Sequence, residues 1–309
     1  MNPHISIVTT LYKSARFLDD FVYQCMAALA EIQCDSYEII FVNDGSLDNS
    51  LAKVLELKQT YESIVVIDLS RNFGHHYALM AGMTYSTGDF VFLADCDLEV
   101  SPQILVTFYR KIMEGGFDVV YGVQEERTGS FIKRVPGSVF YWLFNKFTNT
   151  IIPKNRVTEQ ILNRKYVDSL TAMGDKNIFL AGMMIWVGYK QEPLIIIKQV
   201  REGKSTYSLK KRLLLAFEGI TSFSSFPLVV LFKMGLFITM FSFLLVLYFL
   251  VKKILNPNLV MTGYTSLIVV ILFSLGVIVS SLGIIGIYID KLFNQVKERP
   301  KYVVKNIYK

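Results

Sequence analysis

The 309-residue sequence contains only three cysteines, Cys25, Cys34 and Cys96, at spacings that match neither a disulfide framework nor a metal-binding motif. We therefore expect reduced, structural thiols. No Gly-x-Gly-x-x-Gly motif follows the first strand-like segment, and no Gly-x-x-x-x-Gly-Lys motif occurs. A Rossmann dinucleotide site and a P-loop nucleotide site are therefore unsupported. The sequence also lacks internal repeats and low-complexity linkers.

Charge is missing from two long stretches near the C-terminus. No Asp, Glu, Lys or Arg occurs in 234–251 or in 264–289. Each stretch reaches the roughly 18–20 residues that cross a hydrocarbon core. Two buried core helices are the alternative, but two such runs in succession favour a transmembrane hairpin, with helices at about 232–252 and 264–289.

Basic residues flank these apolar runs unevenly. They are Lys210, Lys211, Arg212 and Lys233 before the first run, Lys252 and Lys253 between the runs, and Lys291, Lys297, Arg299, Lys301, Lys305 and Lys309 after the second. This bias predicts that both termini lie on the cytoplasmic side. No signal-peptide pattern opens the sequence, so we expect the N-terminal domain to remain in the cytosol. The clustered charge, +6 in total, suits an anionic lipid surface better than nucleic acid.

Strand-like and helix-like segments alternate in the first part of the chain. The expected strands are 5–10, 37–42, 63–69, 89–94 and 118–123, and the expected helices are 17–32, 51–61, 75–84 and 102–115. Short apolar strands that alternate with helices predict an α/β fold with a mostly parallel sheet and helices on both faces.

Carboxylates follow two of these strands. Asp95 and Asp97 come directly after the apolar run 90–94, and Asp44 stands in Asn-Asp-Gly-Ser after the second strand. The C-terminal edge of such a sheet is where ligands bind. Two carboxylates can share Mg²⁺ or Mn²⁺ with the oxygens of a nucleotide diphosphate. Solvated turns are the alternative for each motif, and Asp44 alone favours an Asx-type turn. The shared position at strand ends favours a nucleotide site.

Two segments have the character of helices that lie in a membrane interface. The stretch 131–152 interleaves aromatic and basic residues, and 208–226 places basic residues before a run of leucines and phenylalanines. This pattern is typical of interfacial amphipathic helices. For 131–152, an ordinary amphipathic helix packed on the sheet is the alternative.

In order, the sequence carries Val-Asn-Asp-Gly-Ser, Ser-Arg-Asn-Phe-Gly, Ala-Asp-Cys-Asp-Leu, Arg-Glu-Gly-Lys-Ser-Thr-Tyr and Gly-Ile-Thr-Ser-Phe-Ser. With the two apolar runs, this order resembles the inverting family 2 glycosyltransferases that charge polyprenyl phosphate, such as dolichol-phosphate mannosyltransferases and bactoprenol glucosyltransferases. The resemblance implies an A-type glycosyltransferase domain, a nucleotide-sugar donor and a membrane-embedded polyprenyl phosphate acceptor such as undecaprenyl phosphate. It also implies a role in envelope glycan modification, such as that of lipopolysaccharide.

The resemblance assigns roles to individual residues. Asp44 would hold the nucleoside, Asp95 and Asp97 the metal and diphosphate, and Arg201, Ser205 and Tyr207 donor or acceptor phosphate. A guanidinium fork matches phosphate oxygens, although Arg201 could instead snorkel at the interface. Arg71 is a weaker donor-contact candidate, with a helix-entry turn as its alternative.

One segment departs from the resemblance. Bactoprenol glucosyltransferases usually carry Gly-Asp-Phe-Arg-Leu, where this sequence reads Val-Thr-Glu-Gln-Ile at 157–161. Thr158 thus takes the place of the acid often assigned as general base, and Glu159 stands beside it. A lipid phosphate has a second pKa of about 6, so it is mostly a dianionic nucleophile at cytosolic pH and a base is optional.

These observations predict a metal-dependent, inverting glycosyltransferase in the bacterial inner membrane. We expect a cytosolic catalytic domain at 1–207, an interfacial helix at 208–226, two spans within 227–289 and a basic cytosolic tail at 290–309. A homo-oligomer is left open, and no nucleic-acid partner is expected. The alternatives are a processive polysaccharide synthase, whose Gln-x-x-Arg-Trp motif is missing, and an inactive membrane scaffold of the same fold.

Overall fold

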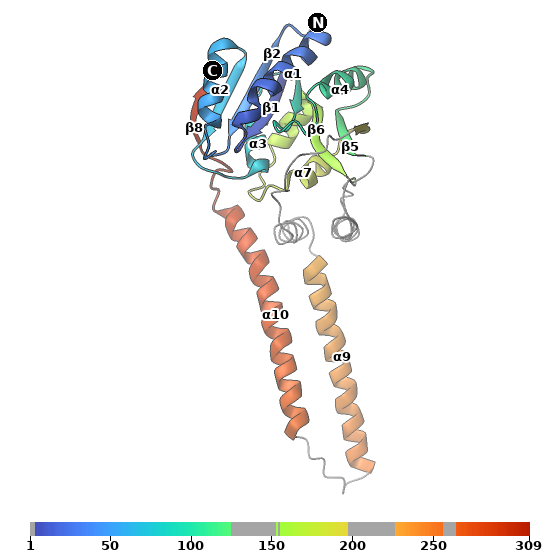
Figure 1. The fold of residues 1–309 in the computed structure, drawn as a ribbon. Coiled ribbons are helices and arrows are strands. Elements are labelled where there is room, and N and C mark those ends of the chain that lie inside the picture. Colours follow the sequence, from blue (N-terminus) through green and yellow to red (C-terminus); the bar gives the residue numbers. More distant parts are fainter. Residues whose placement is uncertain (1–3, 125–152, 154, 197–225, 256–263) are drawn as a thin grey trace.

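The computed structural model describes residues 4–124, 153, 155–196, 226–255 and 264–309 (Figure 1). Its helices and strands, in chain order, are β1 (Ile5–Leu11), the 3₁₀ helix η1 (Ala15–Phe17), α1 (Leu18–Glu31), β2 (Tyr37–Asn43), α2 (Ser50–Thr60), β3 (Ile64–Leu69), α3 (His75–Tyr85), β4 (Phe90–Leu93), α4 (Ile104–Met113), β5 (Val119–Gln124), β6 (Arg156–Asn163), α6 (Arg164–Thr171), α7 (Leu180–Trp186), β7 (Gln191–Ile196), α9 (Phe226–Leu255), α10 (Tyr264–Val296) and β8 (Val304–Tyr308).

The described strands form one sheet in the order β7-β5-β6-β4-β1-β2-β3-β8. Strand β1 pairs in parallel with β2 and β4, β2 with β3, and β5 with β7. Strand β6 runs antiparallel between β4 and β5, and β8 runs antiparallel beside β3. The predicted α/β fold with a mostly parallel sheet is confirmed.

Helices cover both faces of this sheet. Successive residues of a strand point to opposite faces, so Ile7 and Phe41 pack with α1, α2 and α4, whereas Val8 and Ile40 pack with α3, α6 and α7. All four side chains are fully buried. Burial on both faces is the reason these strands read as continuous apolar runs rather than as alternating ones.

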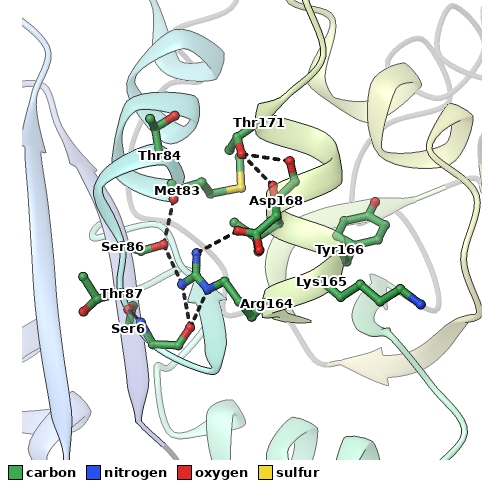
Figure 2. A network of polar contacts seen from close by, with 12 residues as sticks. Ser6, Met83, Thr84, Ser86, Thr87, Arg164, Lys165, Tyr166, Asp168 and Thr171 are labelled. Carbon is green, nitrogen blue, oxygen red and sulfur yellow. Dashed lines mark hydrogen bonds and ion pairs between the residues drawn. The ribbon is translucent and has the colours of Figure 1, made fainter.

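A polar network secures the turn from β6 into α6, at the edge of the sheet where β4 begins (Figure 2). The Arg164 guanidinium donates to the Gly88 carbonyl oxygen from Nε at 2.8 Å and from Nη2 at 2.5 Å. It also donates to Ser86 Oγ at 3.1 Å and lies 3.6 Å from an Asp168 carboxylate oxygen. Arg164 is therefore a structural residue whose charge is balanced locally.

Helices α9 and α10 extend side by side away from the α/β part of the molecule (Figure 1). Within the described residues, Ser274–Val296 of α10 is the one helical stretch whose length and mean hydropathy, 1.7, meet the requirements of a membrane span. Large apolar side chains such as Phe232, Phe237 and Leu282 are exposed on these helices. The two-span hairpin is not confirmed and stays a prediction.

The chain returns from α10 to the sheet. The expected basic tail at 290–309 begins within α10, which continues to Val296, and it contains β8 (Val304–Tyr308). Ser70 N–H donates to the Val303 carbonyl oxygen at 2.9 Å, and Lys305 Nζ lies 3.9 Å from the buried Asp68 carboxylate. The basic residues of this segment did not indicate a strand. β8 is an exposed edge strand, and its pairing with β3, rather than an apolar pattern, specifies it.

The last turn of α10 and the residues after it also hold the α6–α7 connection. Gln295 accepts from Lys176 N–H at 3.0 Å and donates to the Gly174 carbonyl oxygen at 3.0 Å. Lys301 Nζ donates to the Met173 carbonyl oxygen. The end of α10 is therefore fixed to the α/β domain at two places, the α6–α7 connection and the edge of β3.

Candidate active site

Three loops meet at the edge of the sheet where the parallel strands β2, β3 and β4 end. The first carries Asp44 and Gly45, the second runs from Arg71 to Gly74, and the third carries Asp95 and Asp97. Parallel strands end at the same edge, and this edge is the usual ligand site of an open α/β sheet. The loops therefore supply the candidate donor site.

Asp44 joins the first loop to the second. Its buried carboxylate accepts backbone N–H groups from Phe73 at 2.7 Å and Gly74 at 3.0 Å, and its carbonyl oxygen accepts the Asn72 amide at 3.0 Å. Burial raises the pKa of Asp44 above its ordinary value, although the two N–H donors oppose this shift. Asp44 thus has a clear structural role, and its predicted contact with a nucleoside stays a prediction.

Gly45 allows these two loops to touch. Its φ of +59° lies in the left-handed region, and a Cβ there would lie 2.5 Å from the Asn72 nitrogen and 2.6 Å from the Arg71 carbonyl carbon. No other residue fits this approach. Arg71 is exposed beside it, with its guanidinium 4.1 Å from the centre of the Phe73 ring and Nη1 donating to the Asn72 carbonyl oxygen at 3.0 Å.

Asp95 and Asp97 lie on the loop after β4. One Asp95 carboxylate oxygen is 3.7 Å from His75 Nε2, and the side chain is 33% exposed. Asp97 accepts the Glu99 backbone N–H at 3.2 Å. Between them, Cys96 is buried and its thiol donates to the Thr10 carbonyl oxygen at 3.2 Å, which holds the loop against β1.

The donor set at this loop fits a hard cation. Carboxylate oxygens are the ligands that Mg²⁺ prefers, and Mg²⁺ is usually bound by one or two carboxylates together with substrate phosphates and waters. Within the described residues, no cluster of three or more His, Cys, Asp or Glu side chains is arranged to hold a metal. Asp95 and Asp97 therefore suit a metal site that they share with a diphosphate, rather than a site in which the protein supplies every ligand.

A pocket of about 330 Å³ opens beside Asp95. Its lining residues come from α3, the loop after β4, the end of β5, β6 with the residue before it, and α7: His75, His76, Leu79, Asp95, Gln124, Asn155, Arg156, Val157, Thr158, Glu159, Gln160, Leu180, Ala181 and Met184. Leu93 of β4 pairs with Gln160 of β6, so the preceding residues of β6 lie beside the chain that leads to Asp95. The pocket therefore brings Thr158 and the almost fully buried Glu159 to the same place as Asp95.

Two histidines in this pocket were not predicted from the sequence. His75 Nδ1 is 3.0 Å from Thr10 Oγ1, and its other ring nitrogen faces Asp95. Burial, with a smaller contribution from the charge of His75, lowers the pKa of His76 to about 4. His76 is therefore neutral near pH 7. Their position at the start of α3, directly after the Arg-Asn-Phe-Gly turn, was the signal available in the sequence.

The remaining predicted site residues, Arg201, Ser205 and Tyr207, lie outside the described residues. The same holds for the predicted interfacial helix at 131–152 and for nearly all of the one at 208–226. Among the predicted residues that are described, the structure brings Asp95 and Glu159 to one pocket. Asp44 and Arg71 belong to the adjoining pair of loops.

Residues 6–169 match the family described as glycosyl transferase family 2. A Mycobacterium tuberculosis protein named "Putative glycosyltransferases" is 35% identical over 98% of this chain and 88% of its own length. "Uncharacterized glycosyltransferase YkcC" of Bacillus subtilis is 34% identical over 100% of this chain and 96% of its own length. "Prophage bactoprenol glucosyl transferase homolog" of Escherichia coli is 32% identical over 99% of both chains.

The chain belongs to glycosyl transferase family 2. This confirms the predicted family and the class of enzyme, a glycosyltransferase with an A-type-like α/β fold.

Proposed function

We propose that this chain transfers a sugar from a nucleotide-sugar donor to a polyprenyl phosphate carrier, with inversion at the anomeric carbon. The observation that carries the proposal is the similarity to the E. coli bactoprenol glucosyl transferase homologue, which spans 99% of both chains. The match therefore includes α9 and α10 as well as the α/β domain. An acceptor that is itself a membrane lipid accounts for the two apolar helices beside the site.

In the proposed donor site, Asp95 and Asp97 hold Mg²⁺ or Mn²⁺ together with the diphosphate, and Asp44 and Arg71 lie on the side of the nucleoside. The metal, when bound, neutralises charge on the leaving diphosphate. The hydrogen bonds from the Phe73 and Gly74 N–H groups to Asp44 fix the loop after β2 relative to the loop after β3. This preorganisation supports a contribution from positioning, which is a large part of catalysis in group transfer.

In the proposed reaction, a phosphate oxygen of the lipid forms a bond to the anomeric carbon. The bond from that carbon to the nucleoside diphosphate breaks, and its electron pair leaves with the diphosphate oxygen. The attacking monoester is already mostly dianionic near pH 7, so no proton has to be removed. Arg201, Ser205 and Tyr207 are the proposed contacts to the acceptor phosphate, and Glu159 is a candidate catalytic residue in the pocket.

We further propose that α9 and α10 span the bacterial cytoplasmic membrane, with the catalytic domain and both termini in the cytosol. The apolar stretch in α10 and the exposed apolar side chains of both helices support this arrangement.

The test uses the 309-residue chain in nanodiscs that contain undecaprenyl phosphate, with a panel of UDP-, GDP- and dTDP-sugars. We expect one donor to yield a lipid-linked sugar and free nucleoside diphosphate, with loss of both products in EDTA. Asp97→Asn should reduce turnover by a factor of about 100 or more, the size expected when charge stabilisation of the transition state is lost. The control Glu99→Gln, on the same loop, should stay active. Donor hydrolysis without lipid product would contradict the proposed acceptor, and turnover that survives EDTA would contradict the metal site.

A further inference from the structure

Arg156 is a largely buried cation in the pocket beside Asp95. It is the first residue of β6, and its guanidinium lies 4.0 Å from the centre of the Tyr121 ring. Nη1 donates to Gln191 Oε1 at 3.0 Å and Nη2 donates to Gln160 Oε1 at 2.6 Å. Three strands, β5, β6 and β7, therefore hold this side chain in place.

The two glutamines are themselves fixed by α7. Gln160 Nε2 donates to the Met184 sulfur at 3.2 Å, and Gln191 Nε2 donates to the Met184 carbonyl oxygen at 2.8 Å. Because each amide nitrogen is used on Met184, each amide oxygen is turned towards Arg156. The guanidinium is thus oriented before any ligand arrives, which lowers the entropy cost of binding.

The charge of Arg156 is not balanced by its fixed partners. Gln160 and Gln191 are neutral, and within the described part of the chain Arg156 forms no ion pair with a carboxylate. Arg164, in contrast, donates to the Gly88 carbonyl oxygen and also forms an ion pair with the Asp168 carboxylate. Burial lowers the pKa of Arg156, but a guanidinium remains protonated in proteins. An unbalanced buried cation is costly unless an anion joins it.

The geometry points to Arg156 as an anion-binding residue that contacts a phosphate oxygen of a substrate in the pocket beside Asp95. The inference rests on the proposed function, in which both substrates carry phosphate. A guanidinium has five N–H donors, and Gln160 and Gln191 account for two of them. The others can form a bidentate contact with phosphate, which an ammonium cannot reproduce. The phosphate belongs either to the diphosphate of the donor or to the monoester of the lipid acceptor.

The experiment compares Arg156→Lys and Arg156→Gln with the matched control Arg164→Lys. Binding of inorganic pyrophosphate is measured by calorimetry, with Mg²⁺ and with EDTA, and the KM for undecaprenyl phosphate is measured in nanodiscs. Thermal unfolding is recorded for every variant. We expect the Arg156 variants to weaken one of the two phosphate probes by about 10- to 100-fold, the loss typical of a charge-assisted hydrogen bond. Arg164→Lys should lower thermal stability and leave both probes unchanged.

Weakened pyrophosphate binding assigns Arg156 to the donor diphosphate, and a raised KM for the lipid assigns it to the acceptor. Folded Arg156 variants whose constants stay within about twofold of the unchanged protein would overturn the inference. An equal loss in Arg164→Lys would overturn it too, because the effect would then be structural. Failure of the unchanged protein to glycosylate any lipid would refute the proposed function instead, while pyrophosphate binding would still test Arg156.

Discussion

Among single residues, Glu159 has the role that is most open to experiment. It is almost fully buried in the pocket that contains Asp95, next to Thr158, which the resemblance puts in the place of an acid. If the lipid phosphate attacks without a base, Glu159→Gln should lower kcat by less than about tenfold. The pH profile should still follow a group with a pKa near 6, which is the acceptor itself.

The control for this variant is Glu192→Gln, on strand β7, which β5 separates from β6, and outside the pocket lining. Turnover is measured from pH 5.5 to 8.5 for both variants. A loss of about 10²- to 10⁴-fold in Glu159→Gln alone, the size expected for a missing general base, would assign that role to Glu159. It would also refute attack without a base.

His76 gives the stability of the folded domain a specific dependence on pH. Its pKa is lowered to about 4 in the folded chain, and an unfolded histidine has a pKa of about 6.5. Between these values the unfolded chain binds a proton that the folded chain does not, so His76 favours unfolding as the pH falls from about 6.5 to 4. Above about pH 6.5 the histidine is neutral in both states, so the folded chain loses no stability to protonation of His76.

His76→Gln should therefore reduce the loss of stability between pH 7.5 and pH 5. Thermal midpoints in detergent at several pH values give the measurement, and the difference between the two proteins removes the contribution of other titrating groups. His4→Gln, at the opposite edge of the sheet, is a matched histidine control. Parallel pH curves for His76→Gln and the unchanged protein would contradict the lowered pKa.

Among the elements, the parallel strands were predictable, and so were the acids that follow them. Strands β1 to β4 appear in the sequence as short apolar runs because they are buried on both faces. Asp44, Asp95 and Asp97 follow two of these runs, so their common edge could be derived from parallel geometry. Local sequence was sufficient for this part of the site.

Strand β6 was not predicted, and much of the pocket depends on it. It runs antiparallel to β4, so its first residues, rather than its last, lie at the ligand-binding edge. Strand direction cannot be derived from an apolar pattern alone. The roles of Arg156 and Gln160 depend on partners in β7 and α7, which are distant in sequence. Gln160 also stands where the Gly-Asp-Phe-Arg-Leu pattern of the resemblance has Arg. In the structure, the guanidinium of Arg156 instead donates to Gln160.

Helices α9 and α10 predict a specific topology. A cysteine at position 258, in the connection between them, should react with an impermeant maleimide from outside the cytoplasmic membrane, and one at Lys309 should react only from the cytosol. The three native cysteines are buried, and burial raises the pKa of Cys25 and Cys34, so background labelling should be low. Labelling of both sites from the same side would contradict a spanning hairpin.

For the whole molecule, β8 predicts that the segment after α10 is part of the folded catalytic domain. Deletion of 301–309 removes the partner of β3, the contact of Lys305 with Asp68 and the contact of Lys301 with Met173. Each hydrogen bond contributes about 0.5–1.5 kcal/mol, so the summed loss should lower the thermal midpoint and expose an aggregation-prone edge. Deletion of Lys309 alone, beyond β8, is the matched control, and equal stability of the two truncated proteins would contradict this assignment.

The position of β8 also sets the order in which the protein can be completed during translation. Leu69 pairs with Val304, and α9 and α10 are synthesised between them. Until the ribosome has passed α10, β3 keeps an open edge of the kind that invites wrong pairing. A nascent chain thus acquires its last strand only after both apolar helices exist. A premature stop codon after α10 would release a protein with complete helices and an unfinished sheet, which cellular proteases can recognise.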